Sequence, residues 1–323
     1  MIAGFFVVPE SKKVNAQKVD LIGTVLSMLA IVSLVTGFIW VAEHNWLSLH
    51  VLGAFLVFVV FGVLFVKYEA VTKHPLVDLK YLKSREFIDG MIGVGVVFFN
   101  IMGVLFIATQ FMQVVQQKPA LEAGLLILPM AVTVALAAII GQKFADKLGY
   151  SKTIVYGVAL TVVGVLLVSF WSVDSQSWVI ATTLSILGLG AGIVMAPATN
   201  SIMKQFHSKD VGIGSAMNVL VRQVSGVIGV AVLGSVLSIR YSDNLQAYVT
   251  GAPADIANQI TGSIQGAFGF ASELVAQGQV QIANSVVATT SAAFMTGVGA
   301  AMAIAAVVSV VVVVNISRNI PKD

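Results

Sequence analysis

Cysteine is absent from this chain of 323 residues, and charged residues make up only 10% of it. The absence of cysteine excludes disulfides and cysteine-based metal sites. The four histidines fall in or beside expected loops and no two have ligand spacing, so we expect no metal site. The chain also lacks a phosphate-binding loop with Lys-Ser/Thr, a nucleophile elbow and a clustered pair of carboxylates. These absences argue against an enzyme, and the scattering of the basic residues argues against a nucleic-acid-binding protein.

Hydrophobic residues dominate instead, at 58% of the chain, with a mean hydropathy of +0.95. A soluble domain carries roughly 25% charged residues, far more than this chain. Runs of about 20 apolar residues, the length that a helix needs to cross a bilayer, recur along the sequence. We therefore predict an all-α polytopic membrane protein with eight transmembrane helices, at about 21–41, 49–66, 87–110, 123–140, 153–171, 178–202, 211–239 and 285–316.

The positions of lysine and arginine predict the orientation, because cytoplasmic loops carry the excess. If the polar stretch 141–152 is cytoplasmic, 15 of the 18 Lys and Arg residues fall in cytoplasmic segments. Lys118 and Arg240 fall outside, and Arg222 lies within a predicted span. The alternation from loop to loop supports the number of helices and places the C-terminus in the cytoplasm.

The stretch 141–152, GQKFADKLGYSK, is a polar and basic turn between two apolar runs. Gly141 and Gly149 allow positive φ and close backbone approach. Asp146, beside Lys147, could cap the N-terminus of a neighbouring helix, where free N–H groups and the macrodipole favour an anion. That contact would latch two helix ends in one conformation and release them in another. The alternative, which the residues alone favour, is a solvated turn that only follows the charge bias of the loops.

Arg222 lies 11 residues after the start of the seventh predicted span, near the middle of the membrane. A charge there costs about 3 kcal/mol or more and usually faces the interior of the bundle. Asn218 shares its helix face, four residues earlier, and Gln223 is adjacent. One interpretation is a cavity-lining polar face that holds an anionic or hydrogen-bonding group. The other is a structural clamp onto a neighbouring helix.

Polar residues also occur in the third predicted span. Asp89 could relay protons, because burial favours the protonated carboxyl, or it could cap its own helix, which we favour. Asn100, Gln110 and Gln113 could line a cavity or could serve as interhelical hydrogen-bond partners.

The sixth predicted span contains small residues and a proline. Gly188 and Gly192 have the spacing that permits close helix packing, and Pro197 frees a carbonyl and bends the helix. Packing is the favoured interpretation, and a bendable helix that lines a cavity is the alternative.

Three segments flank these spans. Residues 1–19 begin with a short apolar run that resembles the end of an earlier helix. Residues 68–86 carry leucines among charges, which is typical of an amphipathic helix at the cytoplasmic interface. The external segment at about 240–284 has an apolar residue every fourth position, at Ile256, Ile260, Ile264 and Phe268. This spacing predicts a helix that lies on the outer membrane surface or caps the bundle, with a substrate lid as the alternative.

Several of these stretches resemble one family. GQKFADKLGYSK resembles the major facilitator loop motif Gly-x-Leu-Ala-Asp-Arg-x-Gly-Arg-Lys, with matches at Gly141, Ala145, Asp146 and Gly149 and with Lys147 in place of Arg. Further stretches are similar to the drug:proton antiporters with fourteen spans, of the EmrB/QacA type: VPES at 8–11, PLVDLKYLKSREF at 75–87, AGLLILPM at 123–130 and GSAMNVLVRQVSGVIGVAVLG at 214–234.

The resemblance implies an organisation for the chain. The eight spans would be helices seven to fourteen of that family. Residues 1–19 would be the remnant of a preceding helix and its loop, 20–67 a two-helix linker and 68–86 a cytoplasmic connector. Residues 87–323 would form the C-terminal six-helix half. The N-terminal six-helix half would be missing from this chain and is a candidate partner.

The resemblance also implies a function. It indicates a secondary transporter in a bacterial cytoplasmic membrane, with proton-coupled efflux of hydrophobic or cationic drugs by alternating access. The 141–152 motif would belong to a cytoplasmic gate. The lipid bilayer, protons and a small substrate would be the partners, with no cofactor. The alternative is a truncated or split transporter half without transport of its own.

Overall fold

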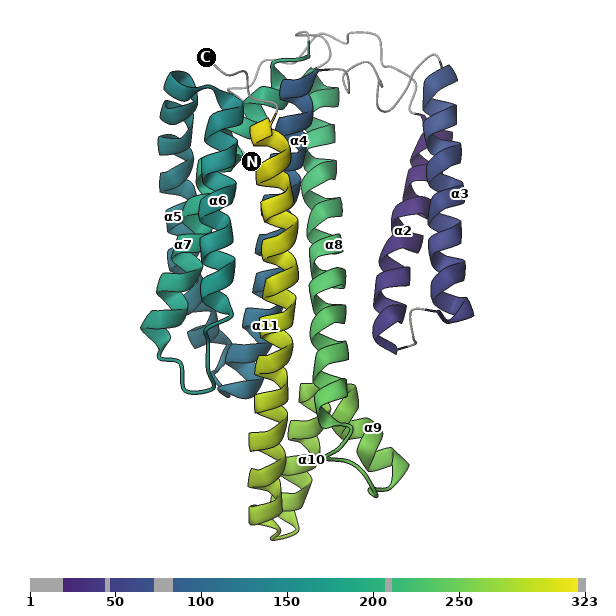
Figure 1. Cartoon of the computed structure of the whole chain (residues 1–323), viewed down its shortest axis with the longest axis vertical. Helices are drawn as coiled ribbons and strands as arrows, with labels where there is room; N and C mark the ends of the chain where they lie inside the picture. The colour runs from purple at the N-terminus through teal and green to yellow at the C-terminus, as the bar shows by residue number, and fades with distance from the viewer. Residues whose placement is uncertain (1–19, 44–46, 73–83, 207–210, 319–323) are drawn as a thin grey trace, which may run out of the picture.

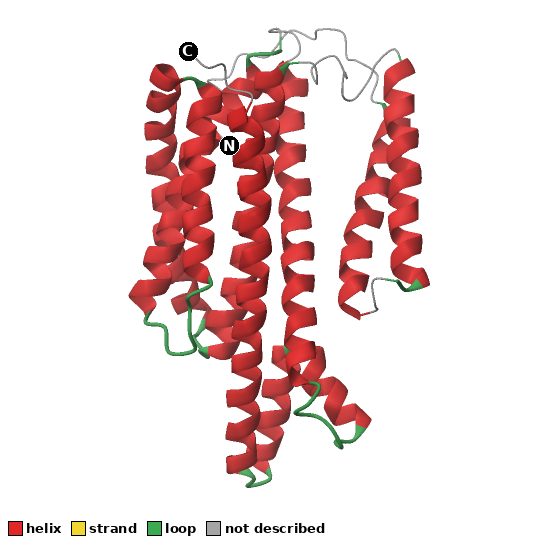
Figure 2. Ribbon diagram, in the orientation of Figure 1, coloured by secondary structure: helices red, strands yellow, loops and turns green. Residues whose placement is uncertain are grey.

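A computed structural model of the chain describes residues 20–43, 47–72, 84–206 and 211–318. Its helices are α2 (Leu21–Glu43), α3 (Leu49–Val71), α4 (Arg85–Gln110), α5 (Ala120–Leu148), α6 (Tyr150–Val168), α7 (Ser177–Met203), α8 (Val211–Leu245), α9 (Ala254–Gly262), α10 (Ile264–Ala276) and α11 (Val280–Arg318). A π-helical turn, η2 (Phe111–Val115), directly follows α4. No strand occurs in these ranges (Figure 2). Eight of the helices are long and apolar enough to cross a membrane, which confirms the all-α polytopic class and the eight spans.

Local sequence explains where several helices begin. The hydroxyls of Ser48 and Ser84 accept the backbone N–H groups of Val51 and Phe87, at 3.3 Å and 3.4 Å, and so cap α3 and α4. Pro119 stands directly before α5, where its missing N–H costs nothing. Several helices also run further than predicted, because polar residues at a membrane face can continue a helix as well as end it.

The helices form two groups (Figure 1). α4 to α8 and α11 pack into one bundle around a shared apolar core. The hairpin α2–α3 stands beside this bundle and touches it through α2 and α8. One of these contacts is a hydrogen bond of 2.5 Å from the Ser235 hydroxyl to the Phe38 carbonyl. Much of the large apolar surface of α2 and α3 is exposed, as expected of helices that face lipid.

The two longest helices extend well beyond the rest of the bundle at one end (Figure 1). α11 has 39 residues, a length of about 58 Å against a hydrocarbon layer of about 30 Å. Its outer part and that of α8 pack with α10 and α9.

The segment at about 240–284, which the charge distribution predicts to be external, differs from the single helix that the four-residue spacing predicted. α9 ends at Gly262 and α10 begins at Ile264, because the Ser263 hydroxyl caps α10 by accepting the Gly266 N–H at 3.0 Å. Ile260 and Ile264 nevertheless both join the core of the bundle. The segment therefore packs on the bundle with its apolar side, as a cap does.

Two predicted segments lie outside the described residues. The remnant 1–19 is one of them, and so is the middle of the connector 68–86, at 73–83. At the two ends of the connector, α3 continues through Val71 and α4 begins at Arg85.

Candidate functional site

The motif 141–152 is mostly helical. α5 continues through Leu148 and α6 starts at Tyr150, so Gly149 is the single non-helical residue between them. The prediction of a turn that starts at Gly141 is therefore wrong. Gly149 has φ +86°, a conformation that favours glycine, and its N–H bonds the Ala145 carbonyl at 2.9 Å. The reversal of the chain needs only this one residue.

Gly141, in contrast, lies within α5 and permits the close approach of α5 to α7. A Cβ at Gly141 would lie 2.4 Å from the carbonyl oxygen of Ile193 and 2.7 Å from its Cα. Pro197 stands four residues after Ile193 and has no N–H, so that carbonyl lacks its usual helical donor. The carbonyl that the proline frees thus lies directly against Gly141.

The other glycines of α7 allow similar contacts. Cβ atoms at Gly188 and Gly192 would lie 2.7 Å and 2.4 Å from carbonyl oxygens of Met130 and Val134 on α5. Gly190 faces α6 instead, where its Cβ would lie 2.5 Å from the backbone nitrogen of Thr161. α7 is therefore held at very short distance between α5 and α6.

Two successive hydrogen bonds from side-chain amides connect Asp146 of the motif to α7. The Asn200 amide donates to Gln142 Oε1 at 2.6 Å, and the Gln142 amide donates to Asp146 Oδ1 at 2.8 Å. Asp146 and Lys147 are exposed, and within the described residues Asp146 does not contact the N-terminus of another helix. Sequence reasoning missed Gln142, although its spacing of four residues from Asp146 on a helix was a usable signal.

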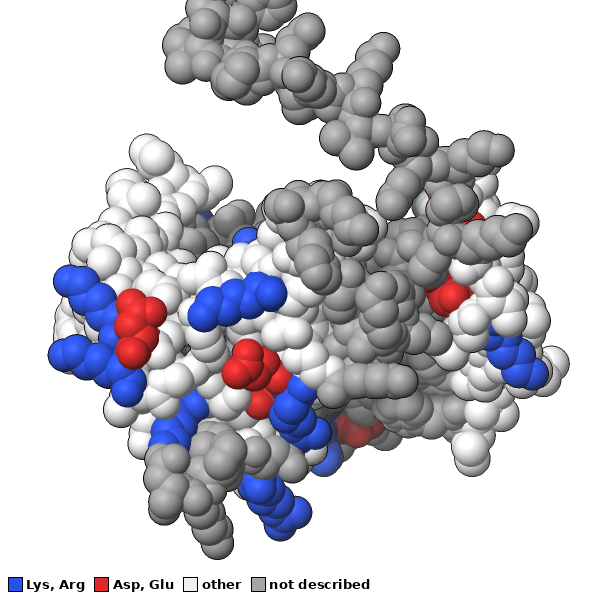
Figure 3. Space-filling view, turned by 90° about the horizontal axis from the view of Figure 1, so that it is seen from above, with Lys and Arg blue, Asp and Glu red and all other residues white. Residues whose placement is uncertain are grey.

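The same end of the bundle collects basic side chains. Lys204, just after α7, lies 4.3 Å from the centre of the Tyr150 ring, and a hydrogen bond with Tyr150 raises the pKa of Lys204. Figure 3 views this end and shows Lys and Arg side chains across it, with fewer acids among them. The helix ends place the following residues here: Lys67, Arg85, Lys143, Lys147, Lys152, Lys204 and Arg318.

Asp89 is buried near the start of α4, with 2% of its surface exposed. The Ser151 hydroxyl, in the first turn of α6, donates to Asp89 Oδ2 at 2.8 Å, and Arg85 Nε lies 3.6 Å from Oδ1. The cap of α4 is Ser84, so the interpretation of Asp89 as the cap of its own helix is wrong. The Asp89 carboxylate instead lies at the start of α6. A contact of this kind, between an acid and the N-terminus of a neighbouring helix, was predicted for Asp146.

Arg222 and Asn218 converge on one residue that sequence reasoning missed. Arg222 Nη2 donates to Thr199 Oγ1 at 2.9 Å, and Asn218 Nδ2 donates to the same oxygen at 3.2 Å. A hydroxyl oxygen has two lone pairs and can accept both. The guanidinium carbon also lies 5.3 Å from the centre of the Phe98 ring. The cluster joins α8 to α7 two residues after Pro197.

The charge of Arg222 is not balanced in this cluster. No carboxylate of the described ranges lies within ion-pair distance of its guanidinium. Arg222 Nε and Asn218 Oδ1 are both buried and lack a hydrogen-bond partner. The bundle therefore holds a positive charge and spare polar atoms in a membrane span, where each is costly.

The other predicted polar residues do not join this cluster. Asn100 is buried and donates to the Ser309 hydroxyl of α11 at 2.8 Å. Gln110 accepts from Gln265 of α10 at 3.1 Å, and Gln113 lies exposed in η2. Gln223 lines a separate cavity against α2. Within the described ranges, no three His, Cys, Asp or Glu side chains are grouped as metal ligands.

Comparison with known proteins agrees with this architecture. The sequence profile of the Major Facilitator Superfamily matches residues 6–230. The chain is 26% identical over 306 residues to the multidrug efflux pump LfrA of Mycolicibacterium smegmatis, which covers 95% of this chain and 60% of that protein. It is 27% identical over 257 residues to the multidrug transporter protein MdtP of Bacillus subtilis, covering 76% and 47%. It is 28% identical over 257 residues to the lincomycin resistance protein LmrB of Listeria monocytogenes, covering 80% and 55%.

The chain thus spans about half the length of the curated relatives that it matches. The family profile covers well over half of the chain itself, and the eight spans suit a family of membrane transporters rather than enzymes. The chain belongs to the Major Facilitator Superfamily.

Proposed function

We propose that this chain forms the C-terminal part of a secondary transporter that exports small hydrophobic or cationic compounds by alternating access, coupled to protons. The names of its relatives support drug efflux. The resemblance to antiporters with fourteen spans supports the division into a linker pair at 20–67 and a six-helix half at 87–323. The basic end supports a cytoplasmic location for the motif and the C-terminus, in a bacterial cytoplasmic membrane.

One observation carries this proposal. Thr199 contacts Arg222 inside the bundle, while the next residue, Asn200, contacts the Gln142–Asp146 chain of the motif. The following residue, Ser201, donates to the Glu86 carbonyl of α4 at 2.6 Å. A single turn of α7 after Pro197 therefore links the intramembrane charge to the motif at the basic end. This is the connection that a gate needs in order to respond to an occupied cavity.

The unbalanced charge of Arg222 defines what the second half of the transporter must supply. A partly buried cation in a membrane span that no described carboxylate balances calls for an anion from elsewhere, either a carboxylate of the complementary half or an anionic group of a substrate. A cationic substrate would be repelled by Arg222 unless carboxylates of the complementary half outweigh that charge. Asp89, a buried acid between α4 and α6, is our candidate within this chain for a proton pathway.

A fusion tests the role of Arg222. The N-terminal half of the Mycolicibacterium smegmatis relative would be joined to this chain and reconstituted in proteoliposomes. We expect Arg222→Ala to change the apparent substrate affinity about tenfold or more while the protein still assembles. Val219→Ala, at an exposed position of the same helix, is the matched control and should behave like the parent fusion. If Arg222→Ala only lowers the amount of folded protein and leaves affinity unchanged, Arg222 is a clamp.

A second candidate function follows from the relative lengths. Because the chain spans about half of its relatives, it could be a truncated or split half without independent transport. Transport by this chain alone, measured beside transport by the fusion, separates the two candidates. Substrate movement with the fusion but not with the chain alone identifies a half that requires its complement.

A further inference from the structure

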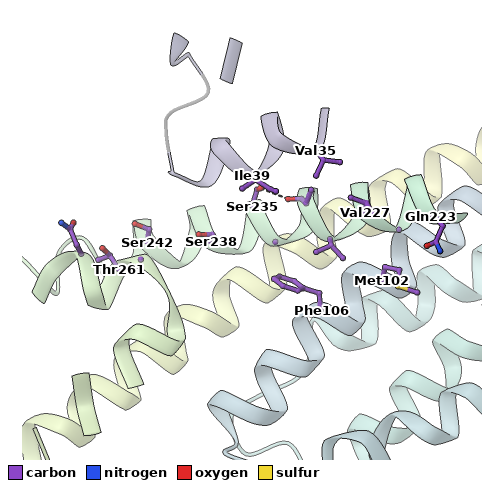
Figure 4. Close-up of a pocket in the computed structure, with 16 residues that line it drawn as sticks. Val35, Ile39, Met102, Phe106, Gln223, Val227, Ser235, Ser238, Ser242 and Thr261 are labelled. Atoms are coloured by element: carbon purple, nitrogen blue, oxygen red, sulfur yellow. Dashed lines mark hydrogen bonds between the residues drawn. The ribbon is translucent and has the colours of Figure 1, made fainter. Parts of the chain in front are cut away.

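A cavity of about 890 Å³ lies between α8 and the helices α2, α4 and α9 (Figure 4). Arg222 does not line it, although the neighbouring Gln223 does. Its lining runs along α8 from Gln223 to Ser242, a length of about 28 Å at the rise of a helix. The cavity is therefore elongated along the helix, and α9 lines its outer end.

The lining contains no ionisable side chain. Val35 and Ile39 of α2 form one wall, and Met102 and Phe106 of α4 form part of the opposite wall (Figure 4). An ion in this cavity would find no counter-charge among these residues, and an isolated charge is costly in apolar surroundings. The cavity suits a neutral molecule.

Polar groups concentrate toward the outer end of the cavity. Ser235, Ser238 and Ser242 follow one face of α8, and Thr261 of α9 lies near the last of them (Figure 4). Asn258, on the same helix as Thr261, also lines the cavity. The remaining cavity-lining amide, Gln223, lies at the opposite end (Figure 4). The cavity thus has an apolar middle and a polar outer end, which is the pattern of an amphipathic ligand.

Some of these polar groups already make hydrogen bonds within the protein, and others do not. The Ser235 hydroxyl contacts the carbonyls of Phe38 and Ala231, and Thr261 bonds within its own helix. The hydroxyls of Ser238 and Ser242 and the amide of Asn258 make no side-chain hydrogen bond to the described part of the chain. Ser238 and Ser242 are only partly exposed, so a ligand that offers acceptors or donors there would satisfy them.

We propose that this cavity binds a neutral single-chain lipid with a hydroxyl- or ester-bearing head, of the monoacylglycerol type, that enters from the bilayer. The acyl chain lies along α2 and α4, and the head meets Ser238, Ser242 and Asn258. The volume falls in the range of small-molecule pockets, roughly 300–1,000 Å³. The lipid fills the space between the α2–α3 hairpin and the bundle, beside the contact of α2 with α8. This inference does not rest on transport, because binding is measured directly.

The test uses the purified full chain in nanodiscs and a monoacylglycerol that carries a photoreactive diazirine on its acyl chain. A trimethylammonium amphiphile with the same diazirine chain is the matched probe for a cationic substrate. We expect the neutral probe to label residues of the cavity, including Met102 and Val230, and unlabelled monoacylglycerol to compete. Labelling by the cationic probe that equals or exceeds the neutral one would overturn the proposal, as would neutral labelling spread evenly over lipid-facing helices.

Variants sharpen the test. Replacement of both Ser238 and Ser242 by Ala should weaken binding of the neutral probe about fivefold to tenfold, through the loss of two hydrogen bonds. Ser272→Ala, at an exposed serine of α10 that bonds within its helix, is the control. Val227→Trp should fill part of the cavity and reduce labelling, which provides a second variant if the double replacement folds poorly. Unchanged binding in well-folded forms of both would refute the site.

Discussion

Thr199 and Asn200 are adjacent in α7, yet their side chains join that helix to two different partners. Thr199 accepts hydrogen bonds from Arg222 and Asn218 of α8, at 2.9 Å and 3.2 Å. Asn200 donates to Gln142 of α5 at 2.6 Å. A movement of this turn therefore cannot leave either contact unchanged.

The first prediction concerns the approach of α5 to α7. Gly141→Ala should lower the free energy of unfolding by about 1–3 kcal/mol, because the new Cβ overlaps the Ile193 carbonyl and the helices must separate. Thermal unfolding in detergent measures this change. Gly124→Ala, on the same helix with open space around its Cβ, is the control and should be neutral or slightly stabilising. Equal stability of the two variants would contradict the packing role of Gly141.

The second prediction concerns the shared acceptor. Thr199→Val keeps the shape of the side chain but removes the oxygen that Arg222 and Asn218 share. Loss of these bonds should destabilise the chain by about 1–3 kcal/mol, since the partly buried Arg222 and the buried Asn218 lose their shared acceptor. Thr296→Val, at an exposed threonine of α11, is the matched control. A stability as high as that of the control would mean that the contact contributes nothing to folding.

The third prediction concerns Asp146. Asp146 accepts a hydrogen bond from Gln142 of its own helix, and its side chain is exposed. Asp146→Asn should therefore leave stability and membrane abundance within about 0.5 kcal/mol of the parent. In the fusion with a complementary half, the same change should lower efflux. Efflux that equals the parent rate, with equal abundance, would remove Asp146 from the gate.

The fourth prediction concerns the short helices α9 and α10. The buried Tyr241 hydroxyl donates to the Ile260 carbonyl at 2.9 Å and anchors α9 to α8. Tyr241→Phe should destabilise this contact by about 1 kcal/mol and should speed hydrogen exchange in α9 and α10. Tyr248→Phe, which removes an exposed hydroxyl 3.3 Å from that of Ser285, serves for comparison. Identical exchange in both variants would argue against this anchor.

The sequence was most informative where hydrophobic length decides the structure. All eight spans were found, because about 20 apolar residues have few alternatives to a membrane helix. The ends were harder to predict. Residues 142–148 continue a helix as readily as they form a loop. The predicted turn 141–152 is therefore a single non-helical residue, Gly149, in the structure. Ser263 divided the segment that follows α8 into α9 and α10, although its capping ability was visible in the sequence.

The contacts of the site were beyond the reach of sequence patterns. Asp89 and Ser151 are 62 residues apart, and Asn200 and Gln142 are 58 apart. Arg222 and Asn218 stood out because charge and amides are rare in a span, but Thr199 did not, since a threonine is ordinary there. The packing of α7 against both neighbours decides which polar groups meet, and that packing depends on glycines whose partners lie on other helices.

The most direct measurement is a double-mutant cycle between Arg222→Gln and Asp146→Asn, read from the transport efficiency of the fusion. Both residues reach the turn after Pro197, one through Thr199 and the other through Gln142 and Asn200. We predict a coupling of at least about 1 kcal/mol, which exceeds the roughly 0.3–0.5 kcal/mol within which the effects of distant sites add. In an Asn200→Ala background the coupling should vanish. Additive effects in the parent fusion, with all variants folded and inserted, would contradict the link between the intramembrane charge and the motif.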